Sequence, residues 1–292
     1  MSKAFSGQSG NTPLVPSWLD DDGAPPAALT APEDGASDGS EGGERPSQVA
    51  APPSLNPLPP NADPTRFTVA RSNFSRFARS GGRDRASLGR AVSHYVGSSA
   101  GGARTAAARM GSSRGAANRL VGFLADTTIR GAAAALKALN LEALAGRPIQ
   151  DVFIGLVDYV CPDGGSIDEG IARGAFIETI ADLAQAGITD LDGLTADQLQ
   201  TVLELYATNA IEARICNDIG SRTVTLPHDP RDAAQVQAQL HDFIRRGVAD
   251  ALTSAQLRVT ALVPDQVLGF VSRVYEQAFG ILQVMGDAEA AK

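Results

Sequence analysis

Apolar residues recur at helical spacing in two short stretches that begin directly after residue 65. The stretches are separated by the glycine pair Gly81-Gly82, which interrupts the pattern. Their repeating apolar positions are Phe67, Ala70, Phe74, Phe77 and Ala78 in the first, and Leu88, Val92, Tyr95 and Val96 in the second. Steps of three and four residues place these side chains on one face of a helix. We therefore expect two amphipathic helices with arginines on their outer faces.

Residues 97–118 have a much weaker pattern, because glycine, alanine and serine dominate them. The arginines at 104, 109, 114 and 119 recur every five residues, a spacing that does not form one stripe on an α-helix. The sequence predicts a mobile or only conditionally helical segment here.

Helical signals are stronger from Leu120 onward. Two sites match the capping box that starts a helix, Ser166 with Glu169 and Thr195 with Gln198. The predicted helices lie near residues 131–146, 148–161, 166–187, 231–252 and 264–285, and a longer one starts at Thr195 and extends at least to Ala210. In the helix near residues 264–285, apolar residues recur at steps of four and three, as in a coiled-coil seam. We favour a helix of the core over a face that binds a partner. A short extended phrase is expected at residues 222–226.

These patterns predict an all-α protein with three parts. Residues 1–65 form a disordered tail rich in proline, glycine and aspartate, since twelve of the seventeen prolines lie there and little in it could be buried. Residues 66–119 form a basic, arginine-rich, partly helical segment. Residues 120–292 form a compact helical domain.

One phrase in the tail departs from this disordered composition. It reads PLVPSW, with Pro13, Leu14, Val15, Pro16 and Trp18, and it holds the only tryptophan of the chain. Short peptides use proline-fixed, aromatic-anchored phrases of this kind to bind grooves. We expect these residues to dock on a partner, with the acidic run that follows steering them toward a basic cleft.

Charge is segregated along the chain. The net charge of −8 is the balance of −7 in residues 1–65, +11 in residues 66–147 and −12 in residues 148–292, counted from the sequence. Such asymmetry indicates different partners for different segments, or docking of one segment on another. The basic positions singled out as a binding segment are Arg66, Arg71, Arg76, Arg79, Arg83, Arg85 and Arg90.

Three interpretations of the basic segment remain open. It could dock on an acidic surface, either of the later helices or of a partner protein, and we rank this first. It could bind nucleic acid, because arginine suits phosphate and aromatic residues are interspersed. The arginines could also simply solvate ordinary amphipathic helices.

Signals of catalysis are scarce. The three histidines lack metal-ligand spacing, and no phosphate loop or nucleophile elbow is present. Asp163, Asp168 and Glu169 could hold a cation, although acidic residues are ordinary at a helix N-terminus. The two cysteines, Cys161 and Cys216, are most simply buried apolar side chains. We expect a protein that is not an enzyme and needs no cofactor or metal. No segment is long and apolar enough to span a membrane, and the expected location is the cytoplasm.

Several long phrases resemble the QatB family, the accessory proteins of bacterial Qat anti-phage defence systems. They are GNTPLVPSWLDDDG, RSNFSRFARSGGRDRASLGRAVSHYV, ALNLEALAGRPI, CPDGGSIDEGIARGAFIETIADL and LTADQLQTVLELYATNAIEARICNDIG. The resemblance implies neighbours in the same system, namely a QueC-like enzyme, an ATPase and a TatD-like nuclease. QueC-type enzymes use ATP to activate the carboxylate of a deazaguanine and transfer it to nitrogen.

In this context the sequence SGQSGN, which precedes PLVPSW, fits a tail that enters an active site. Glycine offers an unhindered amine and lets the backbone approach a ligand closely. The resemblance therefore implies that the tail is trimmed and receives the deazaguanine at Gly7 or Gly10, with Lys3 as a rival amine. The alternatives are a nucleic-acid adaptor that uses the arginines of residues 66–147, and a plain scaffold that bridges the ATPase and the QueC-like enzyme.

Overall fold

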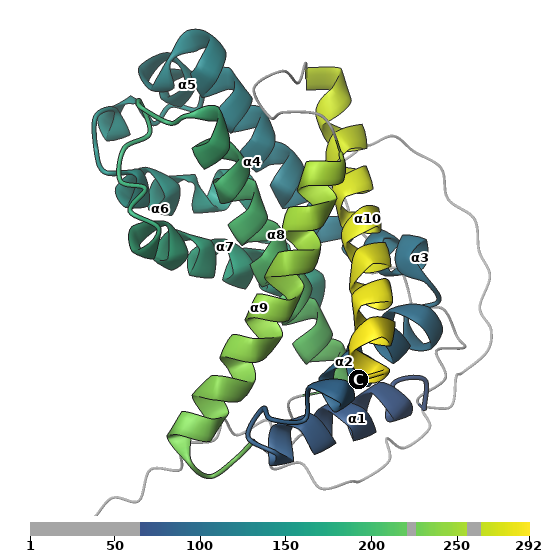
Figure 1. Ribbon diagram of the computed structural model, residues 1–292. Coiled ribbons are helices and arrows are strands. Elements are labelled where there is room, and N and C mark those ends of the chain that lie inside the picture. Colours follow the sequence, from purple (N-terminus) through teal and green to yellow (C-terminus); the bar gives the residue numbers. More distant parts are fainter. Residues whose placement is uncertain (1–64, 221–225, 256–263) are drawn as a thin grey trace, which may run out of the picture. The chain divides into compact units, whose positions relative to one another are not determined.

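A computed structural model describes residues 65–220, 226–255 and 264–292, and every regular element in these ranges is a helix (Figure 1). The expected tail and most of the extended phrase at 222–226 lie outside the described residues. The helices are α1 (Thr68–Arg79), α2 (Arg85–His94), η2 (Tyr95–Ser99), α3 (Ala103–Ala108), α4 (Gly111–Arg130), α5 (Ala132–Ala138), η3 (Glu142–Leu144), α6 (Ile149–Val160), α7 (Ile167–Gln185), α8 (Ala196–Ile219), α9 (Pro230–Ser254) and α10 (Pro264–Ala290). The predicted all-α fold is confirmed for this part of the chain.

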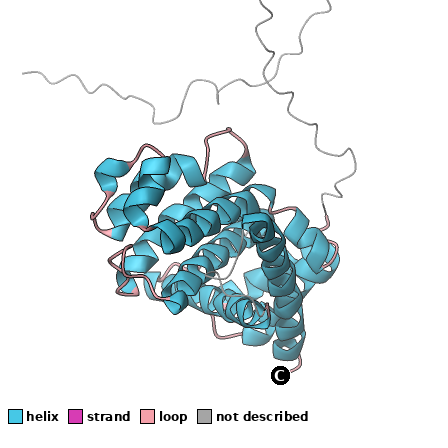
Figure 2. Ribbon diagram, turned by 90° about the horizontal axis from the view of Figure 1, so that it is seen from above, coloured by secondary structure: helices cyan, strands magenta, loops and turns pink. Residues whose placement is uncertain are grey.

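The two amphipathic helices predicted after residue 65 are α1 and the pair formed by α2 and η2. All nine apolar positions of their repeating pattern are buried, and they join the same hydrophobic core as the later helices. Figure 2 shows the described elements as helices joined by loops and turns. Asp84 caps α2 through a hydrogen bond from the Ser87 amide of 2.9 Å. The boundary predicted between residues 119 and 120 falls inside α4.

The basic helices α1 and α2 lie against acidic and carbonyl groups of α8, α9 and α10. Arg83 pairs with Asp232 at 3.3 Å and Arg85 pairs with Glu289 at 2.9 Å. Arg71 donates to the carbonyl oxygens of Ile219 at 2.7 Å and of Asp218 at 3.1 Å, where a cation is favoured by the C-terminal end of α8. Part of the positive charge of residues 66–147 is thus neutralised by carboxylates of the later helices.

Residues 103–118 differ from the expectation of a mobile segment, because they form α3 and the first turns of α4. Four alanines in them are buried, namely Ala106, Ala107, Ala116 and Ala117. Arg114 reaches α10, where it donates to the Ser272 hydroxyl at 3.3 Å. Small side chains give a weak periodic signal but allow neighbouring helices to pack closely, so tertiary contacts override the low helix propensity.

Both predicted capping boxes are present. The Ser166 hydroxyl accepts from the Glu169 amide at 3.2 Å, and the Glu169 carboxylate accepts from the Ser166 amide at 2.9 Å. The same reciprocal pair joins Thr195 and Gln198 at the start of α8. These bonds satisfy backbone amides that have no partner inside the helix.

Substituting Thr195 with alanine should lower the free energy of unfolding by about 1 kcal/mol, since it removes the side chain that accepts the Gln198 amide. The midpoint of urea unfolding would fall while the slope stays unchanged. Thr253→Ala is the matched control, because Thr253 lies near the end of α9 and only donates back to the Ala249 carbonyl. Equal losses in the two variants would contradict a capping role for Thr195.

The final helix α10 is a core helix, as the sequence favoured. Val267, Val271, Val274 and Ala278 of the predicted seam are buried. Phe270, Tyr275, Phe279 and Leu282 are buried as well, so α10 is covered on more than one side. It contacts α2, α3, α4 and α9, and Figure 1 shows it running beside α9 with its C-terminal end at α2.

Candidate functional site

The tail residues predicted to be modified or to dock lie outside the described residues. These are Gly7, Gly10, Pro13, Leu14, Val15, Pro16 and Trp18. The arginines of the predicted binding segment are described, and they lie on or beside α1 and α2.

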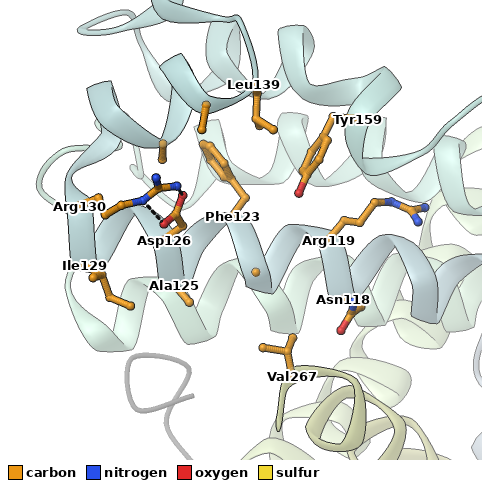
Figure 3. A pocket seen from close by; sticks show the side chains of 13 residues that line it. Asn118, Arg119, Phe123, Ala125, Asp126, Ile129, Arg130, Leu139, Tyr159 and Val267 are labelled. Carbon is orange, nitrogen blue, oxygen red and sulfur yellow. Dashed lines mark hydrogen bonds and ion pairs between the residues drawn. The ribbon is translucent and has the colours of Figure 1, made fainter. Parts of the chain in front are cut away.

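A pocket of about 410 Å³ opens between α4, α5, the end of α6 and the start of α10 (Figure 3). Its walls are largely apolar. Phe123, Leu139 and Val267 contribute them together with alanines of α4 and α5. A pocket of this size and lining suits an apolar side chain or a small apolar ligand.

Polar groups stand at both sides of this pocket. Figure 3 shows Phe123 between the Arg130–Asp126 ion pair on one side and Tyr159 and Arg119 on the other. Arg119 is held in place because its Nε donates to the carbonyl oxygen of Val160 at 2.8 Å. The pocket can therefore bind an apolar group and orient a polar one beside it.

Exposed apolar side chains accompany the pocket. Ile129, which lines it, is 72% exposed, and Tyr159 is 37% exposed. Apolar side chains gathered at a pocket are typical of a surface that another molecule covers.

The sequence pattern did not reveal this pocket. Phe123 reads as an ordinary core position, and Ile129 and Tyr159 read as isolated apolar residues. Ile129 and Tyr159 could have been noticed in the sequence because they fall on the otherwise polar faces of the helices that became α4 and α6. Isolated exposed apolar residues are common, however, and only their convergence in space makes them informative.

The basic segment does not offer its aromatic rings to a ligand. Phe67, Phe74, Phe77 and Tyr95 are all buried. Of the seven predicted arginines, Arg76, Arg79, Arg83 and Arg85 are exposed, while Arg66, Arg71 and Arg90 are half-buried. Stacking of bases between aromatic side chains is therefore not available on this surface.

Two of the three acidic residues that the sequence singled out after α6 make contacts within the fold, while Asp163 is exposed. Asp168 pairs with Arg214, and the Glu169 carboxylate completes the capping box of α7. Among the described residues, no group of three histidine, cysteine or acidic side chains could hold a metal ion. Burial raises the pKa of the Cys161 thiol to about 11, so this cysteine is protonated at neutral pH and a poor nucleophile. His241 pairs with Glu212 at 2.8 Å, which raises the pKa of the imidazole.

Comparison with known proteins gives one family. The family model described as QatB, Qat anti-phage system associated protein QatB, matches residues 101–282. No curated protein and no solved structure matches the chain. Within the described residues, no helix is long and apolar enough to cross a membrane.

Proposed function

The chain belongs to the QatB family and is thus a component of a Qat anti-phage defence system, and from this premise we propose that it binds a QueC-like enzyme of that system and presents its N-terminal tail as a substrate. The observation that carries the proposal is the phrase PLVPSW, with the only tryptophan of the chain, in a tail rich in proline, glycine and aspartate. Leu14, Val15 and Trp18 would dock on the enzyme and fix the register of the residues before them.

The reaction is the transfer of a deazaguanine carboxylate to an amine of the tail. After trimming, the free α-amine of Gly7 or Gly10 attacks the ATP-activated carboxyl carbon. An amide bond forms, the activating phosphate-bearing group leaves, and the amine loses a proton. Glycine suits the acceptor position because it has no side chain to obstruct the approach.

The folded domain would hold the enzyme while the tail enters the active site. The pocket beside α4 supports this role, since it combines apolar walls with Arg119 and Tyr159 at its edge. The residues between the phrase and Arg66 are rich in proline, glycine, alanine and acidic side chains, and they would connect the two contacts. Two linked contacts of this kind bind more tightly than either one alone.

The substitution Ile129→Asp should weaken binding of the full-length protein to the QueC-like enzyme by about tenfold or more, because it places a charge where apolar contact is expected. Ile129 is 72% exposed, so thermal unfolding of the free protein should change little. Val284→Asp is the matched control, at an apolar residue of α10 that is 68% exposed. Calorimetric titration of both variants with the enzyme measures the difference, and equal affinities would remove the pocket from the interface.

The proposal is tested by the intact mass of the protein after co-expression with and without its QueC-like neighbour, followed by mapping of the N-terminal peptide. A truncated tail that carries the mass of an added deazaguanine is the expected result. An unmodified tail in the presence of active enzyme, ATP and the deazaguanine would remove the substrate role.

The nucleic-acid alternative uses the arginines of residues 66–147. Its support is weaker because the interspersed aromatic residues are buried and several arginines pair with α8, α9 and α10. Deleting residues 1–19 separates it from the substrate role, since nucleic-acid binding would survive the deletion. A scaffold that bridges the ATPase and the QueC-like enzyme would likewise survive it, as would contact with the TatD-like nuclease through the folded helices.

A further inference from the structure

Arginines from several helices converge beside the start of α1. Arg66 precedes α1, Arg71 lies in its first turn, and Arg214 belongs to the last turns of α8. Arg109 directly follows α3, and it is close enough to Arg66 and Arg214 to interact with them electrostatically. The aromatic rings of Phe67 and Tyr95 stack at 5.7 Å in their midst. The Arg66 and Arg71 guanidinium groups lie 4.5 and 5.7 Å from the centre of the Phe67 ring. We call these four arginines the arginine cluster.

The carboxylates near the arginine cluster are already engaged. Asp218 Oδ2 accepts from Tyr95 Oη at 2.9 Å and from Arg214 Nε at 3.1 Å. Asp168 pairs with the other end of Arg214. Four guanidinium groups thus face two carboxylates, which leaves a net charge of +2. Arg214 and Asp218 are themselves largely buried, with side chains 14% and 8% exposed.

Arg109 is the member of the arginine cluster whose buried donor lacks a hydrogen-bond acceptor in the described part of the chain. Its Nη1 is buried and has no hydrogen-bond acceptor among the described residues. Burial, and after it the neighbouring Arg66 guanidinium, lower the pKa of Arg109. A buried guanidinium donor without an acceptor is costly, and repulsion from other arginines adds to that cost. A bound anion would accept the unpaired hydrogen bond and would reduce the repulsion between the arginines.

We propose that the arginine cluster is a binding site for a phosphate-class oxyanion, held by the unpartnered Nη1 of Arg109 together with Arg66. Arginine presents planar paired donors that match the oxygens of a phosphate group. A water molecule could accept the Arg109 bond, but it would leave the excess of positive charge uncompensated. The phosphate could be free or the terminal group of a nucleotide, and the two sources differ only in what the phosphate carries. This site is separate from the pocket beside α4 and does not depend on the substrate role of the tail.

The test is calorimetric titration of the full-length protein with inorganic phosphate and with adenosine monophosphate, at ionic strength balanced by sodium chloride. Wild-type protein should bind, and Arg109→Gln should bind about tenfold more weakly or worse, because one charge-assisted hydrogen bond is lost. Arg104→Gln is the matched control. Arg104 lies on the same helix, is exposed, and is not part of the cluster. It should bind as the wild type does.

A second variant tests the site independently, in case Arg109→Gln does not fold. Arg66→Gln changes a half-exposed residue before α1 and should also weaken binding without lowering the unfolding temperature. Tighter binding of adenosine monophosphate than of phosphate would identify a nucleotide as the source, and equal binding would favour free phosphate. Absence of any heat or thermal shift beyond that of chloride would overturn the proposal, as would wild-type affinity in Arg109→Gln.

Discussion

Replacing Gly286 with alanine should destabilise the protein by about 3 kcal/mol, the upper range for forcing an extra carbon into a packed site. A Cβ at this position would lie 2.7 Å from the carbonyl oxygen of Gly89 and 2.9 Å from the amide nitrogen of Ser93. Both are backbone atoms of α2, so no side-chain rotation can relieve the clash. The helices α2 and α10 would have to separate.

The contact is reciprocal, because a Cβ on Gly89 would lie 2.6 Å from the carbonyl oxygen of Gly286. Gly89→Ala should therefore cost about as much as Gly286→Ala. For a chain of this size the expected loss corresponds to a fall in unfolding temperature of roughly 10 °C. Circular dichroism during heating measures it directly.

Gly269→Ala is the matched control within the same helix. Nothing lies within 4 Å of a Cβ built on Gly269. Alanine is the better helix former by about 1 kcal/mol, so this variant should be slightly more stable than the wild type. A similar fall in both variants would contradict close backbone packing of α2 against α10.

Replacing Leu14, Val15 and Trp18 together with alanine should reduce deazaguanine addition to the tail by about a hundredfold or more, since aromatic and apolar anchors dominate binding of short peptides. The unfolding temperature should not change if these residues act only through the partner. Mass spectrometry of the N-terminal peptide after timed incubation with the QueC-like enzyme, ATP and the deazaguanine gives the rate.

The control removes the same number of apolar residues from the tail. It replaces Leu29, Leu55 and Leu58, which lie outside the phrase, with alanine. This variant should be modified at the wild-type rate. Equal rates in all three proteins would show that PLVPSW has no docking role, whereas equal losses would point to a general effect of apolar residues in the tail.

The sequence by itself determined much of the local structure. The capping boxes at Ser166 and Thr195 and the buried stripe through Phe74 and Phe77 depend on residues three or four positions apart. Interactions at that distance are formed within one helix, so a window of the sequence contains both partners. The phrase around Trp18 and the long resemblance to the QatB family are also properties of the sequence alone, and the family match over residues 101–282 confirms the family.

Only the tertiary structure decided how distant segments meet. The crossing of Gly89 with Gly286, the pairing of Arg85 with Glu289, and the convergence of Arg66, Arg109 and Arg214 join residues that are far apart along the chain. The start of α4, made of small residues, becomes helical because its neighbours cover it. The pocket around Phe123 exists because α4, α5, α6 and α10 leave space between them. Such contacts depend on helix packing angles and on the volumes of side chains from several helices at once. A periodic pattern shows which face of a helix is buried, but not which helix buries it.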